Sequence, residues 1–525
     1  MSYKRLFSGI IVIFIAVMVG SVFASNGTQI GTVGARPTAM GSNFRGLADD
    51  WTAFHYNPAG LTQLTNKWTI GVSLGMIMPR GSYMPYAFPA TVAPFPGLST
   101  DKATLVEQNF AVPSLAIFYK PSEKLTVGLG VAGPFGLGAK FDLIEIPTAY
   151  GNDTPLTNTE ETTSDHQVVN IQPTIALKLS DKISVGVGIG YIGLLKSPKL
   201  ASTYMKLNQI AVPEYGAVIL EQSPNSYPGY LQMVGMLQLF GVYNPDHSRI
   251  ILENIMDGKE GTSWNISVGV HIKVNESLSL GASGRYYTDL KLKGTMIRKI
   301  HFPGDTGVYA ATARGYFASL PGAQTIDSLT ALGGIQQIFN GTTTNITYDA
   351  EADLPLPLTI GAGVAYKPVP KLTFVADVSW SRWSTWETID ISLTDQATGE
   401  RETVSMAENW KNTFEYGVGA DYCLLEQENM KLNLRGGVYM VDTPSPQSTI
   451  SPTILDPKNR TVLTGGLGLS LGKIEFAVAY ERVMLGKATV PNYVFDDESW
   501  GVNDNWAGVY ELNANVITFE TTIGL

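Results

Sequence analysis

The stretch that decides the fold of this chain is Leu372-Thr373-Phe374-Val375-Ala376-Asp377-Val378-Ser379-Trp380. Apolar residues occupy every second position from Leu372 to Trp380, whereas Thr373, Asp377 and Ser379 lie between them. A period of two is typical of a β-strand whose two faces meet different surroundings. The same alternation recurs at 125–131, 183–191, 266–274, 358–366, 416–424 and 474–482, with Gly, Ser, Thr or charged residues on the second face. We therefore expect an all-β protein.

The lengths of the connections between strands separate two kinds of β protein. In a soluble sandwich the apolar face meets a second sheet, whereas in an outer-membrane barrel it meets lipid. Short turns, such as 119–125 and 177–183, alternate here with long connections such as 197–262, 299–354 and 392–408. Bacterial outer-membrane barrels have short periplasmic turns, long extracellular loops and an even number of strands. The sequence predicts a transmembrane antiparallel β-barrel of about fourteen strands over residues 67–525.

The composition agrees with a barrel and excludes other classes. The chain has 54 Gly, 9 Trp, 24 Tyr and 20 Phe, and only 16% of its residues are charged. A net charge of -10 argues against a nucleic-acid partner. A single cysteine, Cys423, excludes an internal disulfide framework. The five histidines have no metal-like spacing, so we predict no metal, no cofactor and no enzymatic activity.

The two ends of the chain indicate export. Lys4 and Arg5 precede an apolar run over 6–19, and small residues up to Ala24 fit a signal-peptidase site, so residues 1–24 are predicted to be a signal peptide. The run is shorter than the roughly 20 residues of a membrane-spanning helix, which argues against an anchor. The last residue is Leu525 rather than an aromatic residue, and the effect of this on barrel assembly is left open.

Residues 25–66 lie between the signal peptide and the first strand and lack strand-length alternation. They contain Gly46-Leu47-Ala48-Asp49-Asp50 and Asn57-Pro58-Ala59-Gly60-Leu61. Asn-Pro and Gly favour turns anywhere in a protein. Because about fourteen strands enclose a lumen too wide for side chains to fill, a compact plug in this place is sensible.

These two motifs, followed by Gly133-Pro134-Phe135-Gly136-Leu137 and Asn409-Trp410-Lys411-Asn412-Thr413, occur in an order that resembles the FadL/TodX family of outer-membrane transporters. The resemblance covers most of the mature chain. It implies passive import of long-chain fatty acids and other hydrophobic compounds. It also implies that residues 25–66 form a hatch. The working residues of that hatch would be Asp49, Asp50, Asn57, Pro58, Ala59 and Gly60.

A proline in an early strand suggests a lateral gate. Pro134 cannot donate to the ladder of hydrogen bonds, so Gly133, Pro134, Phe135 and Gly136 mark either a strand end or bulge, or an inward kink that opens the wall. A closed barrel has no free edges, so a side exit needs such a defect. The resemblance implies sideways release of cargo through a kinked early strand, which favours the second interpretation.

Two further sets of residues are candidates for binding cargo. In the loop 197–262, apolar residues follow helical spacing and would form either a loop lid or an external capture groove. Arg285 and Arg435 are predicted to face the lumen, where an arginine suits a carboxylate, although most such charges solvate the pore or pair with acids such as Asp421 or Glu415. The loop set comprises Tyr230, Leu231, Met233, Val234, Met236, Leu237 and Phe240.

The predicted function is passive transport of a hydrophobic small molecule, first a long-chain fatty acid, across the outer membrane of a Gram-negative-type bacterium. Capture by loops, gating by the hatch and lateral release would be its steps, in a monomer surrounded by outer-membrane lipid. Aromatic or aliphatic hydrocarbons are the alternative cargo. The alternative function is a structural or secretion-accessory barrel that binds a protein partner and transports nothing.

Overall fold

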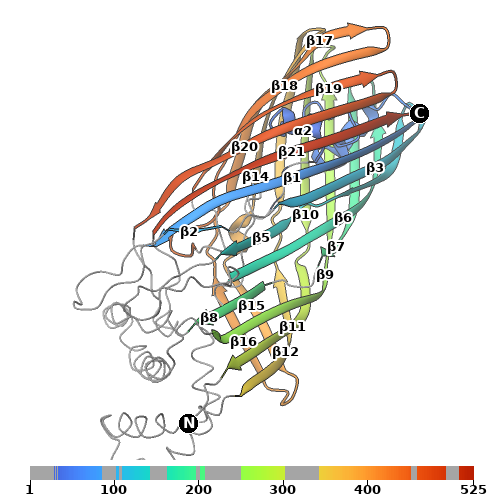
Figure 1. Ribbon diagram of the computed structural model, residues 1–525. Helices are drawn as coiled ribbons and strands as arrows, with labels where there is room; N and C mark the ends of the chain where they lie inside the picture. The colour runs from blue at the N-terminus through green and yellow to red at the C-terminus, as the bar shows by residue number, and fades with distance from the viewer. Residues whose placement is uncertain are drawn as a thin grey trace, which may run out of the picture.

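The computed structural model describes residues 29, 31, 33–85, 102–105, 109–141, 162–196, 201–206, 250–301, 342–450, 458–491 and 508–525. These residues are almost all in strands, which form one tall barrel with short helices inside one end (Figure 1). No helix in these ranges is both long enough and apolar enough to span a membrane. The predicted signal peptide, residues 1–24, and the predicted loop set from Tyr230 to Phe240 lie outside the described residues.

Fourteen antiparallel strands close the barrel, as the alternation predicts. β1 pairs with β3 on one side and with β21 on the other, and the main-chain N–H of Leu525 donates to the carbonyl of Trp68 at 2.9 Å. The wall strands are β1 (Trp68–Pro85), β3 (Phe110–Ser122), β4 (Leu125–Ala132), β6 (Thr162–Lys178), β7 (Ile183–Lys196), β9 (Ile250–Lys273), β10 (Leu278–Tyr287), β13 (Thr359–Val369), β14 (Leu372–Ser381), β17 (Thr413–Gln427), β18 (Met430–Val441), β19 (Arg460–Leu471), β20 (Ile474–Val490) and β21 (Gly508–Gly524).

Further strands continue the wall beyond the end that lies opposite the short turns. Those at 201–206, 343–354 and 401–407 lie within 197–262, 299–354 and 392–408, where the sequence predicts connections, so these connections contain strands that the alternation does not predict. The reason is physical: outside the hydrocarbon layer a strand needs no apolar outer face, and here Tyr348 and Leu354 point inward while Lys293 and Glu351 form an exposed ion pair. These elements are β2 (Ala103–Thr104), β5 (Gly136–Phe141), β8 (Ala201–Lys206), β11 (Leu290–His301), β12 (Thr343–Leu354), η4 (Trp383–Thr385), β15 (Thr388–Asp395) and β16 (Arg401–Ala407).

The two faces of the wall strands differ as the alternation predicts. Phe374 and Val378 of β14 are 47% and 46% exposed, whereas Val375 and Ser379 are buried on the inner face. The exposed set continues around the barrel with residues such as Ile189, Trp264 and Tyr416, and it forms the surface that faces lipid.

Residues 33–66, here called the inner segment, fold into α2 (Ala35–Ala39), α3 (Ala53–Tyr56) and the 3-10 helix η1 (Pro58–Gln63) inside the barrel (Figure 1). Glycines on the inner faces of the strands make room for it. A Cβ atom at Gly281 would overlap the carbonyl of Arg45, and one at Gly186 would overlap the peptide between Pro58 and Ala59. The glycine-rich inner faces are therefore seats for the inner segment.

Beyond the inner segment, apolar side chains cover the inner surface of the wall; we call these two clusters the apolar lining. This differs from a water-filled barrel, whose interior is polar. One cluster includes Phe135, Tyr287, Met296, Leu354, Trp383 and Trp386. The other includes Ile77, Tyr83, Phe110, Val112, Tyr510 and Leu512.

Candidate functional site

The side-chain amide of Asn57 forms hydrogen bonds that hold the inner segment in its fold and against the wall. Its side chain is fully buried, and its Nδ2 donates to the carbonyls of Arg45 and Val270, both at 3.0 Å. Its Oδ1 accepts from the N–H of Ala59 at 3.2 Å. One amide thus joins two parts of the inner segment to β9.

The residues after Asn57 fit the same arrangement. Pro58 begins η1, at a position where a missing N–H costs nothing. A Cβ atom at Gly60 would overlap the carbonyl of Ala48, so only glycine allows this close approach. The structure thus brings Asn57, Pro58, Ala59 and Gly60 together against the wall, within the segment predicted to be the hatch.

A second polar contact is centred on Arg36, which sequence reasoning missed. Its Nη1 lies 2.6 Å from Oδ1 of Asp49 and 3.2 Å from Oδ2 of Asp50, and its Nε lies 3.7 Å from Oδ2 of Asp421. The main-chain N–H of Arg36 donates to Oε2 of Glu520 at 3.1 Å. Asp421 is in β17 and Glu520 in β21, so no local signal in the sequence reveals the contact.

Arg435 belongs to the same set of charges. Its Nε lies 3.0 Å from Oδ2 of Asp421 and its Nη2 lies 2.8 Å from Oε1 of Glu475. The side chain is only 3% exposed. Two carboxylates already compensate the charge of this guanidinium, so it has no excess positive charge to attract a cargo carboxylate.

The wall is interrupted at the predicted gate. β4 ends at Ala132 and β5 begins at Gly136, and the ladder between β3 and β4 stops at the pair Leu115–Val131. In the described part of the chain, β5 pairs with β6 and no pairs join it to β3. Residues 110–114 of β3 therefore face the interruption at Gly133, Pro134 and Phe135.

Phe135 stands in this interruption and connects it to the lumen. Its carbonyl accepts from the N–H of Val168 at 3.3 Å, and its ring meets that of Tyr287 edge-on with centroids 5.0 Å apart. Gln29, near the N-terminus, forms an isolated antiparallel bridge with Phe135 and donates from Nε2 to Oγ1 of Thr359 at 3.1 Å. Gln29 thus lies at the break, in contact with Phe135 and Thr359.

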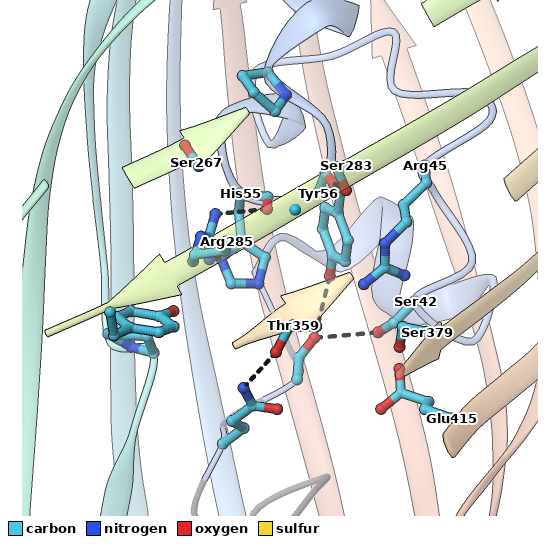
Figure 2. A pocket seen from close by; sticks show the side chains of 16 residues that line it. Ser42, Arg45, His55, Tyr56, Ser267, Ser283, Arg285, Thr359, Ser379 and Glu415 are labelled. Atoms are coloured by element: carbon cyan, nitrogen blue, oxygen red, sulfur yellow. Dashed lines mark hydrogen bonds between the residues drawn. The ribbon is translucent and has the colours of Figure 1, made fainter. Parts of the chain in front are cut away.

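A polar cavity of about 90 Å³ lies beside the break, between the inner segment and the wall (Figure 2). Pockets that enclose a drug-sized ligand measure roughly 300–1,000 Å³, so this cavity suits a polar head group rather than a whole lipid. Its lining includes Pro134, Arg45, His55, Tyr56, Arg285, Tyr287, Thr359 and Glu415.

Arg285 carries a positive charge into this cavity without a carboxylate partner among the described residues. Its Nη1 donates to Nδ1 of His55 at 3.1 Å, its Nη2 donates to the carbonyl of His55 at 2.7 Å, and its Nε is buried without a partner. Burial, together with the charges of Arg285 and Arg45, lowers the pKa of His55 well below its usual range, so the imidazole is neutral.

The other charges of the cavity lie apart from Arg285. Arg45 is paired with Asp377 at 3.3 Å, and Glu415 lies near Arg45 in Figure 2, on the side of the cavity away from Arg285. Arg285 is therefore the cation that remains for an anionic ligand in the described cavity.

Comparison with known proteins agrees with this fold. Over 87% of the chain, the sequence is 23% identical to the outer membrane protein NMB0088 of Neisseria meningitidis serogroup B, with 86% of that protein covered. The structure of a Pseudomonas aeruginosa FadL homologue has a TM-score of 0.65 at 17% identity, covering 95% of this chain and 99% of its own. The Pseudomonas putida toluene transporter TodX has a TM-score of 0.60 at 13% identity, covering 94% and 99%.

A family model described as outer membrane protein transport protein (OMPP1/FadL/TodX) matches residues 16–523. This range includes the inner segment, the interruption at Pro134 and the wall strands, apart from the last residue of β21. The chain belongs to the OMPP1/FadL/TodX family of outer membrane transport proteins.

Proposed function

We propose that this protein carries long-chain fatty acids passively across the outer membrane. The observation that carries the proposal is Arg285, which has no carboxylate partner among the described residues and lies in a polar cavity that the apolar lining adjoins at Tyr287. An extended amphiphile fits this combination, because its chain is favoured by the apolar lining and its carboxylate by the guanidinium.

The cargo would follow a route of capture, passage through the lumen and sideways release. Loop residues from Tyr230 to Phe240 would capture it, and the apolar lining would take its chain. The break at Gly133, Pro134, Phe135 and Gly136 would release it sideways into the bilayer. The inner segment would act as the hatch that prevents leakage of water and ions.

The charge at Arg285 favours a fatty acid over a hydrocarbon as cargo. TodX, a relative in fold, is a toluene transporter, and toluene has no group that could neutralise a partly buried guanidinium. An uncompensated charge in contact with a hydrocarbon would be unfavourable. A carboxylate at the same place would form charge-assisted hydrogen bonds, which contribute about 1.5–3 kcal/mol each.

The test compares binding of oleate and of oleyl alcohol, which differ only in the head group, to the purified barrel. Arg285→Gln should weaken oleate binding about 10- to 100-fold, the equivalent of one charge-assisted hydrogen bond, and leave the alcohol unchanged. Arg482→Gln is the matched control, because Arg482 donates to Asn515 at 2.9 Å away from the cavity.

Two results would contradict the proposal. Equal losses for oleate and the alcohol in Arg285→Gln would mean that the arginine only supports the fold, since it also bonds the carbonyl of His55. A barrel that binds neither compound, and is purified with one protein partner in fixed ratio, would favour the accessory function.

A further inference from the structure

Five carboxylates and two guanidiniums are packed where the inner segment meets β17, β18, β20 and β21. Arg36 is the only cation that the inner segment contributes to this set, and Arg435 comes from the wall. With every group ionised the set carries three more negative than positive charges. The carboxylates are Asp49, Asp50, Asp421, Glu475 and Glu520.

Glu520 is the carboxylate that makes this excess of negative charge unfavourable for docking of the inner segment. Its oxygens accept from the main-chain N–H of Arg36 at 3.1 Å and from Nε1 of Trp51 at 3.0 Å. Among the residues that the structure describes, no cation lies within ion-pair distance of it. Docking of the inner segment therefore places Asp49 and Asp50 near a buried carboxylate that only neutral donors compensate.

Asp50 is the member of the set best placed to hold a proton. Its Oδ1 accepts from the N–H of Thr52 at 2.8 Å, its Oδ2 faces Arg36, and its side chain is 13% exposed. The pKa of Asp50 is raised to about 7: burial is the largest cause, Glu520 and Asp49 add to it, and Arg36 and the hydrogen bond from Thr52 oppose it. Away from the wall, Asp50 would lose the burial against the wall and the charge of Glu520, so its pKa should fall toward the usual value of 3.8.

We propose that this cluster is a pH-responsive latch, in which the inner segment takes up a proton at Asp50 when it docks and releases the proton when it leaves the wall. Acid then holds the hatch closed, and a rise toward neutral pH frees it. This regulation rests on the proposed role of the inner segment as a hatch. It adds a control that does not depend on cargo.

The direction of the pH dependence follows from the protonation of Asp50 in the docked and the undocked segment. The docked state holds the extra proton between pH 3.8 and about 7, so docking is most favoured below that range. Within it, undocking becomes up to about tenfold more favourable for each unit of pH, and above pH 7 the effect is complete. Between pH 5 and 7 the undocked fraction should rise up to about 100-fold.

Hydrogen exchange of the full-length barrel in nanodiscs, without cargo, tests the latch. After correction for the intrinsic pH dependence of exchange, amides of residues 52–57 should open more often as pH rises from 5 to 7. Asp50→Asn, which stays neutral, should remove that dependence. Asp49→Asn should retain the dependence but move it to lower pH, because the charge of Asp49 also raises the pKa of Asp50.

Glu520→Gln provides a second variant, and it should move the transition to lower pH because a charge that raises the pKa of Asp50 is gone. Heat-modified migration in gels confirms that each variant forms a barrel. Flat exchange in the unmodified protein, or an unchanged slope in a folded Asp50→Asn, would overturn the latch. Neither result would affect the oleate comparison, because binding to Arg285 is measured separately.

Discussion

Replacing Asn57 with alanine should release the inner segment while leaving the barrel intact. The change removes three hydrogen bonds, two at 3.0 Å to carbonyls and one at 3.2 Å from Ala59, from a fully buried side chain. Two of these bonds lie within the inner segment and one crosses to Val270 of β9, so at about 1 kcal/mol for each bond docking should weaken by about 1–3 kcal/mol, the upper value applying where the segment unfolds as it leaves the wall. That corresponds to a roughly 5- to 100-fold larger undocked population, since 1.4 kcal/mol is tenfold.

Conductance of single barrels in planar bilayers measures this directly. A barrel of about fourteen strands whose plug has moved leaves an open lumen, so Asn57→Ala should show frequent conducting bursts. Asn275→Ala is the matched control, because Asn275 lies exposed in a short turn and accepts only from Ser277 at 2.8 Å. Bursts no more frequent than in that control would refute the account of how the segment is held.

Two further substitutions test the glycines that make room for the inner segment and the proposed lateral gate at Pro134. Gly281→Ala should weaken docking of the inner segment by about 1–3 kcal/mol, because the added methyl group overlaps Arg45, and it should raise conductance. Gly436→Ala, where the nearest atom to the added Cβ is 3.8 Å away, should change neither. Equal effects of the two substitutions would argue that the inner-face glycines do not make room for the segment. Pro134→Ala restores a main-chain donor at the break and should slow fatty-acid uptake without loss of barrel in the membrane; unchanged uptake would argue against the gate.

The strands could be predicted from the sequence because each one carries its own signal. The alternation in 372–380 requires only that one face meets lipid, and β14 bears it out with Phe374 and Val378 exposed. The extension β12 was missed because its apolar residues, such as Tyr348 and Leu354, face inward. That pattern is the reverse of the one used to find membrane strands.

The contacts of the inner segment could be predicted only in part. The Asn-Pro motif identifies the segment, but the partner of Asn57 in β9 is 213 residues away and Glu520 is 484 residues from Arg36. Arg285 and Arg435 look equivalent in the sequence, since both lie on inner strand faces. The carboxylates that distinguish them, Asp421 and Glu475, come from other strands.

A reversible lock of the gate is the most direct test of lateral release. A Cβ atom at Gly133 would lie 3.5 Å from Cγ1 of Val112 across the break, close enough for a disulfide in Val112→Cys/Gly133→Cys. The native Cys423 is buried and should not interfere. Oleate uptake should stop when the pair is oxidised and return on reduction, while each single variant is unaffected. Equal uptake in the oxidised and reduced states would contradict release through the wall at Pro134.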